Sequence, residues 1–266
     1  MNFDIKFELK KIILATKNIK GTYAKQHTNS KYSLDLIINE LMYFLKSGVS
    51  WRMLRSPINS KTLFWHYTRF IENNVFLRLF NKIKNGYLKN YIDDACSLFI
   101  DSTIIYNKNG INKIGRNKFY KNKKATKISL MTDKYGFPLS VLFMKGNYHD
   151  IRVFNSHIRD AIVIMPNKKL KIIADKAYAS KNNYELLDEK NIDHIIPPRK
   201  NMKIAKTYKY DKIEYMERIK IEHIFARLKM FRRLDNRHDK YIRNYAGFVY
   251  LAFVIIANNI IKKRNM

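Results

Sequence analysis

Three acidic side chains, far apart in the sequence, could together bind a metal ion. Asp101 interrupts the apolar stretch "LFIDST", Asp175 closes "KIIAD", and Glu222 lies further along in "RIKIEHIF". A buried carboxylate is costly unless it is paired or ligates a metal. Three oxygen ligands without a cluster of Cys or His favour Mg²⁺ or Mn²⁺ over zinc. Taken singly, each Asp also fits the commoner role of a cap or turn residue, so the inference depends on all three.

Glu222 also belongs to a row of polar residues on a predicted helix. At about 100° per residue, four side chains fall within roughly 60° of the helix circumference: Tyr215, Arg218, Glu222 and Lys229. Apolar residues lie on the opposite side, at Ile221, Ile224, Leu228 and Phe231. A solvated helix surface with mixed charges would explain the polar row equally well.

The elements that position these residues are predicted from apolar patterning. Five stretches predict β-strands, at residues 96–106, 125–133, 139–146, 170–175 and 193–198. Helices are predicted at 150–164, 180–190, 214–233 and 241–262. The order βββαβαβαα predicts an α/β fold, with a mixed sheet flanked by helices. Asp175 would close a strand at its carboxyl end, where ligand sites of such sheets gather.

Two further helices are predicted before the sheet. The first spans 33–48, with Ser33 as its N-cap and Gly48 as a left-handed stop. The second is capped by Ser60 and continues to about residue 74. This pair favours a helix-turn-helix DNA reader or, equally, an ordinary helical hairpin. The reader's second helix would expose Lys61, His66 and Arg69. We therefore expect a helical domain at 1–90 and an α/β domain at 91–266.

The composition bounds the class of partner. The chain has 266 residues, of which 46% are hydrophobic, and its 52 Lys and Arg against 22 Asp and Glu give a net charge of +30. Such an excess indicates a polyanionic partner. Nucleic acid is favoured over a membrane because the basic residues are spread along the chain. Compositional drift in an AT-rich genome would also raise the Lys content.

Other features predict a soluble intracellular protein. Cys96 is the only cysteine, which excludes an internal disulfide and a thiolate zinc cluster and fits a reducing compartment. The first residues lack the pattern of a secretory signal. The uncharged stretch "AGFVYLAFVIIA" is short for a membrane span and predicts a buried helix.

The polar row makes the sequence resemble a known family. Tyr215, Arg218, Glu222 and Lys229 match, without a gap, the Y-x₂-R-x₃-E-x₆-K signature of DDE transposases of the insertion-sequence-four superfamily. "IDST" and "ADKAYAS" resemble the blocks around the first and second catalytic Asp. "LKSGVSWRML", "GNYHDIRVF", "IIPPRKN" and "FRRLDNRHDKY" resemble blocks of the insertion-sequence-five branch. The chain departs from the family in having "GRNKFYKNKKATK" in place of a glycine-rich patch, and Ala177 where Gly is common.

The resemblance implies an RNase H-like catalytic domain in which Asp101, Asp175 and Glu222 bind two divalent cations, Mg²⁺ or Mn²⁺. It also implies that Arg218 and Lys229 hold DNA phosphates, while Tyr215 stacks on or bonds to the strand near the cut. Further candidate DNA contacts are Lys127 on the second strand and, on the N-terminal reader helix, Lys61, His66 and Arg69.

The implied function is cut-and-paste DNA transposition. The protein would bind the terminal inverted repeats of a mobile element as a homodimer, cleave the strands and join them to target DNA. We expect it in the cytoplasm on the nucleoid, or in the nucleus of a eukaryotic host, and not at a membrane. The alternatives are a catalytically inactive or domesticated DNA-binding relative, another RNase H-like nuclease and a membrane-surface protein.

Overall fold

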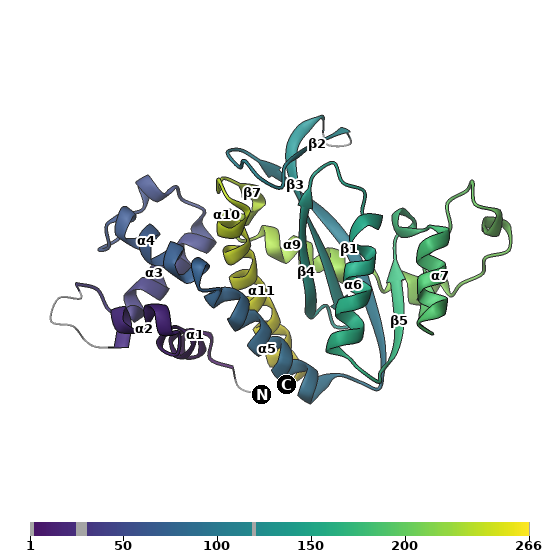
Figure 1. Cartoon of the computed structure of the whole chain (residues 1–266), viewed down its shortest axis with the longest axis horizontal. Coiled ribbons are helices and arrows are strands. Elements are labelled where there is room, and N and C mark those ends of the chain that lie inside the picture. The colour runs from purple at the N-terminus through teal and green to yellow at the C-terminus, as the bar shows by residue number, and fades with distance from the viewer. Residues whose placement is uncertain (1–2, 25–30, 119–120, 266) are drawn as a thin grey trace. The chain divides into compact units, whose positions relative to one another are not determined.

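A computed structural model describes residues 3–24, 31–118 and 121–265 (Figure 1). The chain divides into two compact units. The first comprises Met1–Gly86, Lys108–Asn112 and Arg227–Met266, and the second comprises Tyr87–Asn107 and Lys113–Ala226. This division differs from the predicted one at residue 90, because the C-terminal residues group with the N-terminal helices. The roles expected of the two predicted domains, DNA recognition and catalysis, stay predictions.

The first unit is built from helices. In chain order they are α1 (Ile5–Leu14), α2 (Lys17–Ala24), α3 (Leu34–Ser47), the 3₁₀ turn η1 (Trp51–Met53), α4 (Ser60–Glu72), α5 (Val75–Tyr91, whose last residues pass into the second unit), α10 (Arg232–Asp235) and α11 (Ile242–Arg264). Helices α1, α2 and α5 are not among the elements predicted from the sequence.

The two predicted N-terminal helices are confirmed as α3 and α4. The Ser33 hydroxyl accepts a hydrogen bond from the Leu36 N–H, and Gly48 ends α3 in the left-handed region at φ 69°. Glycine reaches that conformation without the steric cost that a Cβ imposes. The predicted cap of α4 is wrong by one residue. Asn59, not Ser60, accepts the capping hydrogen bond, from the Lys61 N–H at 2.9 Å.

The C-terminal helix α11 lies in the core of the first unit. Its Phe248 stacks on Tyr67 of α4 with ring centroids 4.2 Å apart, and the Tyr67 hydroxyl donates to the Asn244 carbonyl. Within the described residues, α11 is the one helix long and apolar enough to cross a membrane, but 83% of its most apolar 18-residue window is buried. The prediction that this stretch is a buried helix is confirmed.

The second unit is built around a mixed sheet. Its strands are β1 (Ala95–Asn107), β2 (Gly115–Asn117), β3 (Lys123–Asp133), β4 (Pro138–Lys145), β5 (Lys169–Ala174) and β6 (Asp193–Ile195). They follow the order β2-β3-β1-β5-β6, with β4 also paired to β3. β3 is antiparallel to β1, β2 and β4, whereas β5 is parallel to β1 and β6. The five predicted strands and the mixed sheet are thereby confirmed.

Helices follow the strands in the predicted order. Those of the second unit are α6 (Ile151–Ile164), α7 (Lys181–Glu189), α8 (Lys212–Met216) and α9 (Ile219–Lys229), of which α9 ends in the first unit. The single helix predicted over 214–233 is wrong, because α8, α9 and α10 are separate. Around the first break the backbone tightens to i→i+3 bonds, including Ile221 N–H to the Arg218 carbonyl at 3.1 Å. At the second, Phe231 is extended, with ψ 99°.

Candidate active site

Asp101 and Asp175 lie next to one another on adjacent parallel strands. β1 and β5 pair through Ile100 and Ala174, and each acid directly follows one of these two residues in the sequence. Side chains alternate between the two faces of a sheet, and neighbouring strands lie about 4.8 Å apart. The two carboxylates therefore lie on the same face, beside the carboxyl end of β5. Asp175 also caps the short helix η3 (Lys176–Tyr178), accepting the Ala177 N–H at 2.8 Å.

Arg218 links the first acid to the third. Its Nη1 lies 2.8 Å from Asp101 Oδ2, and its Nη2 lies 2.8 Å from Glu222 Oε1. The Arg218 and Asp101 side chains are 18% and 21% exposed, whereas Glu222 is 51% exposed. One guanidinium thus stands as a cation between two carboxylates that are 121 residues apart.

Burial decides the electrostatics of Asp101. Desolvation raises the pKa of its carboxyl to about 6, although the Ser102 backbone N–H and the charge of Arg218 act to lower it. Asp175 and Glu222 raise it further, so the three carboxylates act on one another electrostatically. Burial also disfavours the charge of Arg218, but Asp101 and its other neighbours raise the pKa of that group above its ordinary value.

The three acids have the chemistry of a site for a hard divalent cation. All three offer carboxylate oxygens, and the raised pKa of Asp101 marks a buried charge that a bound cation would stabilise. Within the described residues, however, no three His, Cys, Asp or Glu side chains are arranged to hold a metal ion. Arg218 lies between Asp101 and Glu222 instead, and it has to move before both can share an ion. The metal-binding roles of the three acids stay predictions.

The other members of the polar row are divided between elements. Tyr215 lies on α8, half-buried, with the Arg218 guanidinium 5.9 Å from its ring centre. Burial raises the pKa of the Tyr215 hydroxyl. Lys229 is the last residue of α9 and belongs to the first unit. The predicted DNA contacts of Tyr215, Arg218 and Lys229 are not tested by this arrangement.

Lys127 is not a free phosphate ligand in this structure. Its side chain is 8% exposed, and its Nζ donates to Asp150 Oδ1 and to the Tyr148 carbonyl, each at 2.9 Å. The Ser102 hydroxyl donates to the same Asp150 oxygen at 2.5 Å. A buried ammonium needs such partners to offset its desolvation. Lys127 and Asp150 therefore hold the chain beside Asp101.

A buried histidine lies behind the same strand. Ser129 Oγ is 3.5 Å from the Asp101 carbonyl oxygen and 2.8 Å from His157 Nε2, while His157 Nδ1 is 3.0 Å from Ser140 Oγ. Burial lowers the pKa of His157 to about 3, which makes it neutral. His157 is not among the residues predicted from the sequence. The signal available was small hydroxyl residues at inward positions of two buried strands.

The three predicted DNA contacts on α4 differ in exposure. Lys61 is exposed. Arg69 is partly buried, donates to the Asn18 carbonyl at 3.1 Å and stacks over Trp65 at 4.8 Å. The expected exposure of His66 is wrong, because it is 8% exposed and its Nδ1 lies 2.6 Å from the Tyr23 hydroxyl. Burial lowers the pKa of His66 to about 4. Its position four residues before Phe70 places it against the packed side of α4.

Comparisons with known proteins identify the family and the fold of the chain. The family described as the transposase DDE domain matches residues 93–257. No curated protein matches the sequence. Among solved structures, the piggyBac transposase in a synaptic complex with hairpin DNA aligns at a TM-score of 0.61 and 10% identity, covering 97% of this chain and 73% of that one. The predicted RNase H-like sheet, preceded by helices, is confirmed.

A second solved structure is more distant. The catalytic domain of the Mos1 mariner transposase aligns at a TM-score of 0.29 and 10% identity, covering 68% of this chain and 85% of that chain.

Proposed function

Because the chain belongs to the transposase DDE domain family, we propose that it catalyses cut-and-paste DNA transposition. In this proposal it binds the terminal inverted repeats of a mobile element, cleaves DNA strands and transfers the liberated ends to target DNA. The family supports transposition and, in general, nuclease and strand-joining chemistry. The Tyr215, Arg218, Glu222 and Lys229 signature further favours the insertion-sequence-four superfamily, and blocks such as "GNYHDIRVF" and "IIPPRKN" favour its insertion-sequence-five branch.

One observation carries the proposal. Residues 101, 175 and 222 are remote in sequence, yet Asp101 neighbours Asp175 across β1 and β5 and shares the Arg218 guanidinium with Glu222. Carboxylates repel one another, so their grouping costs free energy unless a cation compensates. A site that binds metal ions and phosphate accounts for that cost better than a purely structural role, because Glu222 is half-exposed and could otherwise turn to solvent.

The mechanism assigns separate roles to the acids and to Arg218. Asp101, Asp175 and Glu222 would hold two divalent cations, Mg²⁺ or Mn²⁺. When bound, these would acidify an attacking water or 3′-hydroxyl and stabilise the departing oxygen of the phosphodiester. Arg218 would turn from the acids to the DNA phosphate, which a guanidinium binds with paired donors. Tyr215 and Lys229 would orient the strand. No covalent nucleophile from the protein is required in this mechanism, so Ser102, whose hydroxyl donates to Asp150, is not assigned that role.

The proposed partner is double-stranded DNA, at the element ends and at the target. Two ends must be held together for paired cleavage and joining, so we propose a homodimer on DNA. The piggyBac relative was solved as a synaptic complex with hairpin DNA. The helix α4 would read bases through Lys61 and the accessible part of Arg69. We place the protein in the cytoplasm on the nucleoid, or in the nucleus of a eukaryotic host.

Cleavage by the purified chain tests the proposal. The substrate is a plasmid that carries the reading frame with its native flanking DNA, incubated with Mg²⁺, and the junctions of all products are sequenced. We expect breaks at short inverted repeats and joined products with a small target duplication. Asp101→Asn should reduce cleavage by at least about a hundredfold, since removal of a ligand of the catalytic ions removes most of their charge stabilisation.

Asp188→Asn is the matched control, because Asp188 is an exposed acid on α7 away from the three-acid cluster. It should cleave at the parental rate. Equal cleavage by Asp101→Asn would overturn the mechanism. DNA binding without cleavage by the parent would identify the inactive relative, and cleavage without joined products would identify another RNase H-like nuclease.

A further inference from the structure

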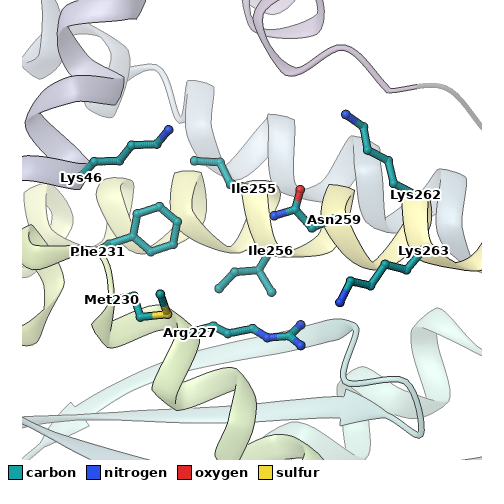
Figure 2. A pocket seen from close by; sticks show the side chains of 9 residues that line it. All are labelled: Lys46, Arg227, Met230, Phe231, Ile255, Ile256, Asn259, Lys262 and Lys263. Atoms are coloured by element: carbon teal, nitrogen blue, oxygen red, sulfur yellow. The ribbon is translucent and has the colours of Figure 1, made fainter.

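A cavity of about 660 Å³ in the first unit is lined mainly by cationic and apolar side chains. Four cationic side chains line it, Lys46 from α3, Arg227 from α9, and Lys262 and Lys263 from α11. Figure 2 shows them spread around Phe231 and Ile256, which form an apolar floor. No acidic residue lines the cavity. Its volume lies in the range of roughly 300–1,000 Å³ that is usual for small-ligand sites.

The cations are not used by the protein itself. All four are exposed, and none takes part in an ion pair within the described part of the chain. Three helices, α3, α9 and α11, bring their last turns to this cavity, which partly explains why basic residues occur here. Each helix C-terminus carries only about half a negative charge. Three such ends offset less than half of the positive charge, so the cavity keeps an excess that favours an anion.

The apolar floor of the cavity indicates which class of anion would bind. A simple inorganic anion gains nothing from the partly exposed Phe231 ring, which would stay hydrated beneath it. A nucleotide of an unpaired DNA strand satisfies both parts of the cavity. Its phosphates can lie against the cationic rim, and its base can cover the aromatic floor, as in single-strand binding by stacking and charge together. Duplex DNA cannot do this, because its bases are already stacked within the helix.

We propose that this cavity holds an unpaired nucleotide of a DNA strand, with the base on Phe231 and its phosphates among Lys46, Arg227, Lys262 and Lys263. The site would bind the single-stranded end or a melted position of the DNA on which the enzyme acts, so the inference rests on the proposed function. It is independent of the three acids, which lie in the other unit.

Binding of two matched probes tests the base contact. One is a fluorescein-labelled duplex with a short single-stranded 3′ overhang, and the other carries abasic sites throughout the same overhang. Fluorescence anisotropy is measured in EDTA, so that cleavage plays no part. We expect the parent to bind the intact overhang about tenfold more tightly than the abasic one. Phe231→Leu, which keeps the floor apolar but removes the ring, should reduce this ratio to about threefold or less.

A second variant protects the test against misfolding of Phe231→Leu. Asn259 is exposed on α11 and lines the cavity, so Asn259→Trp should obstruct the cavity without disturbing the core. We expect it to remove the preference for the intact overhang as well. Both variants should keep the parental circular dichroism spectrum.

The cationic rim is tested with a charge-matched pair. Lys262→Ala combined with Lys263→Ala should weaken binding of the intact overhang about tenfold. Lys11→Ala combined with Lys17→Ala removes the same charge from exposed positions on α1 and α2, and should weaken it about twofold or less.

Three outcomes would overturn the inference. They are equal affinity of the parent for intact and abasic overhangs, equal loss in the two lysine pairs, and tighter binding of an acidic aromatic peptide than of the overhang. Failure of Mg²⁺-dependent cleavage with the base preference intact would count against the proposed function alone.

Discussion

At the scale of single residues, the site is governed by a buried carboxylate whose counter-charge is supplied by one arginine. Asp101 pairs with Arg218 at 2.8 Å, yet its pKa is raised to about 6, because burial outweighs the pairing. The same residue is therefore a cost to the metal-free fold and the strongest candidate for a cation ligand. Stability sacrificed at a functional site is expected when function requires a charge to be buried.

Stability as a function of pH measures this cost. The Asp101 pKa is about 6 in the folded chain against an ordinary value of 3.8, so folding favours the protonated acid. Its contribution is fully present below about pH 4 and is lost as the pH rises through 6. The difference in free energy of unfolding between Asp101→Asn and the parent should therefore shift in favour of the variant as the pH rises. The shift between about pH 4 and pH 7 should be up to about 3 kcal/mol. Urea unfolding with a metal chelator measures it.

If the Asp101→Asn difference is independent of pH, burial does not control the charge of Asp101, and the electrostatic account of the site fails.

At the scale of elements, a buried ion pair fixes the strands that carry the site. Lys127 of β3 donates to Asp150, which precedes α6, and Ser102 of β1 donates to the same carboxylate. The contact therefore ties two adjacent strands to the start of a helix, directly beside Asp101. Removal of one partner from a buried pair leaves the other uncompensated, which is more costly than the loss of the attraction alone.

Lys127→Met should accordingly lower the free energy of unfolding by about 3 kcal/mol, as measured by urea denaturation. Lys124→Met is the control, since Lys124 lies on the same strand with its side chain exposed, and it should change stability by less than about 0.5 kcal/mol. Asp150→Asn combined with Lys127→Met should cost less than the sum of the single changes. If Lys127→Met leaves stability unchanged but weakens DNA binding, Lys127 binds a phosphate and is not a structural residue.

At the scale of the whole molecule, the net charge of +30 calls for a polyanion or for a compositional explanation. The four cations around the 660 Å³ cavity are exposed, and none of the residues that line the cavity is acidic, which agrees with a polyanionic partner. Lys61 on α4 is exposed as well. Other lysines serve the fold, as Lys127 and Lys171 do in ion pairs. The charge therefore has structural and surface components.

The salt dependence of DNA affinity shows whether the excess positive charge binds DNA or is only compositional. With six to ten phosphate contacts, affinity for a duplex of unrelated sequence should fall by about 10³–10⁵ between 50 and 200 mM salt. Anisotropy titrations at several salt concentrations give the slope. A slope that corresponds to fewer than about two contacts would mean that most of the excess charge is compositional.

The sequence alone determined five of the strands, the helices α3, α4, α6, α7 and α11 and the catalytic candidates, because these depend on local patterns. Alternating and continuous apolar runs specify the strands, and Ser33 and Gly48 mark the ends of α3 through their own backbone chemistry. The spacing of Tyr215, Arg218, Glu222 and Lys229 can be read without coordinates.

Tertiary structure decided what each of these side chains contacts. No Gly or Pro marks the breaks between α8, α9 and α10, where packing and long-range pairing outweigh helix propensity. His66 and Lys127 look available in the sequence, but are buried against Tyr23 and Asp150. That Asp101 faces Glu222 across Arg218 depends on a contact between residues 117 positions apart, and no local pattern encodes such a contact. Burial and charge partners follow from the packed chain, because desolvation and Coulomb energies depend on distance in space.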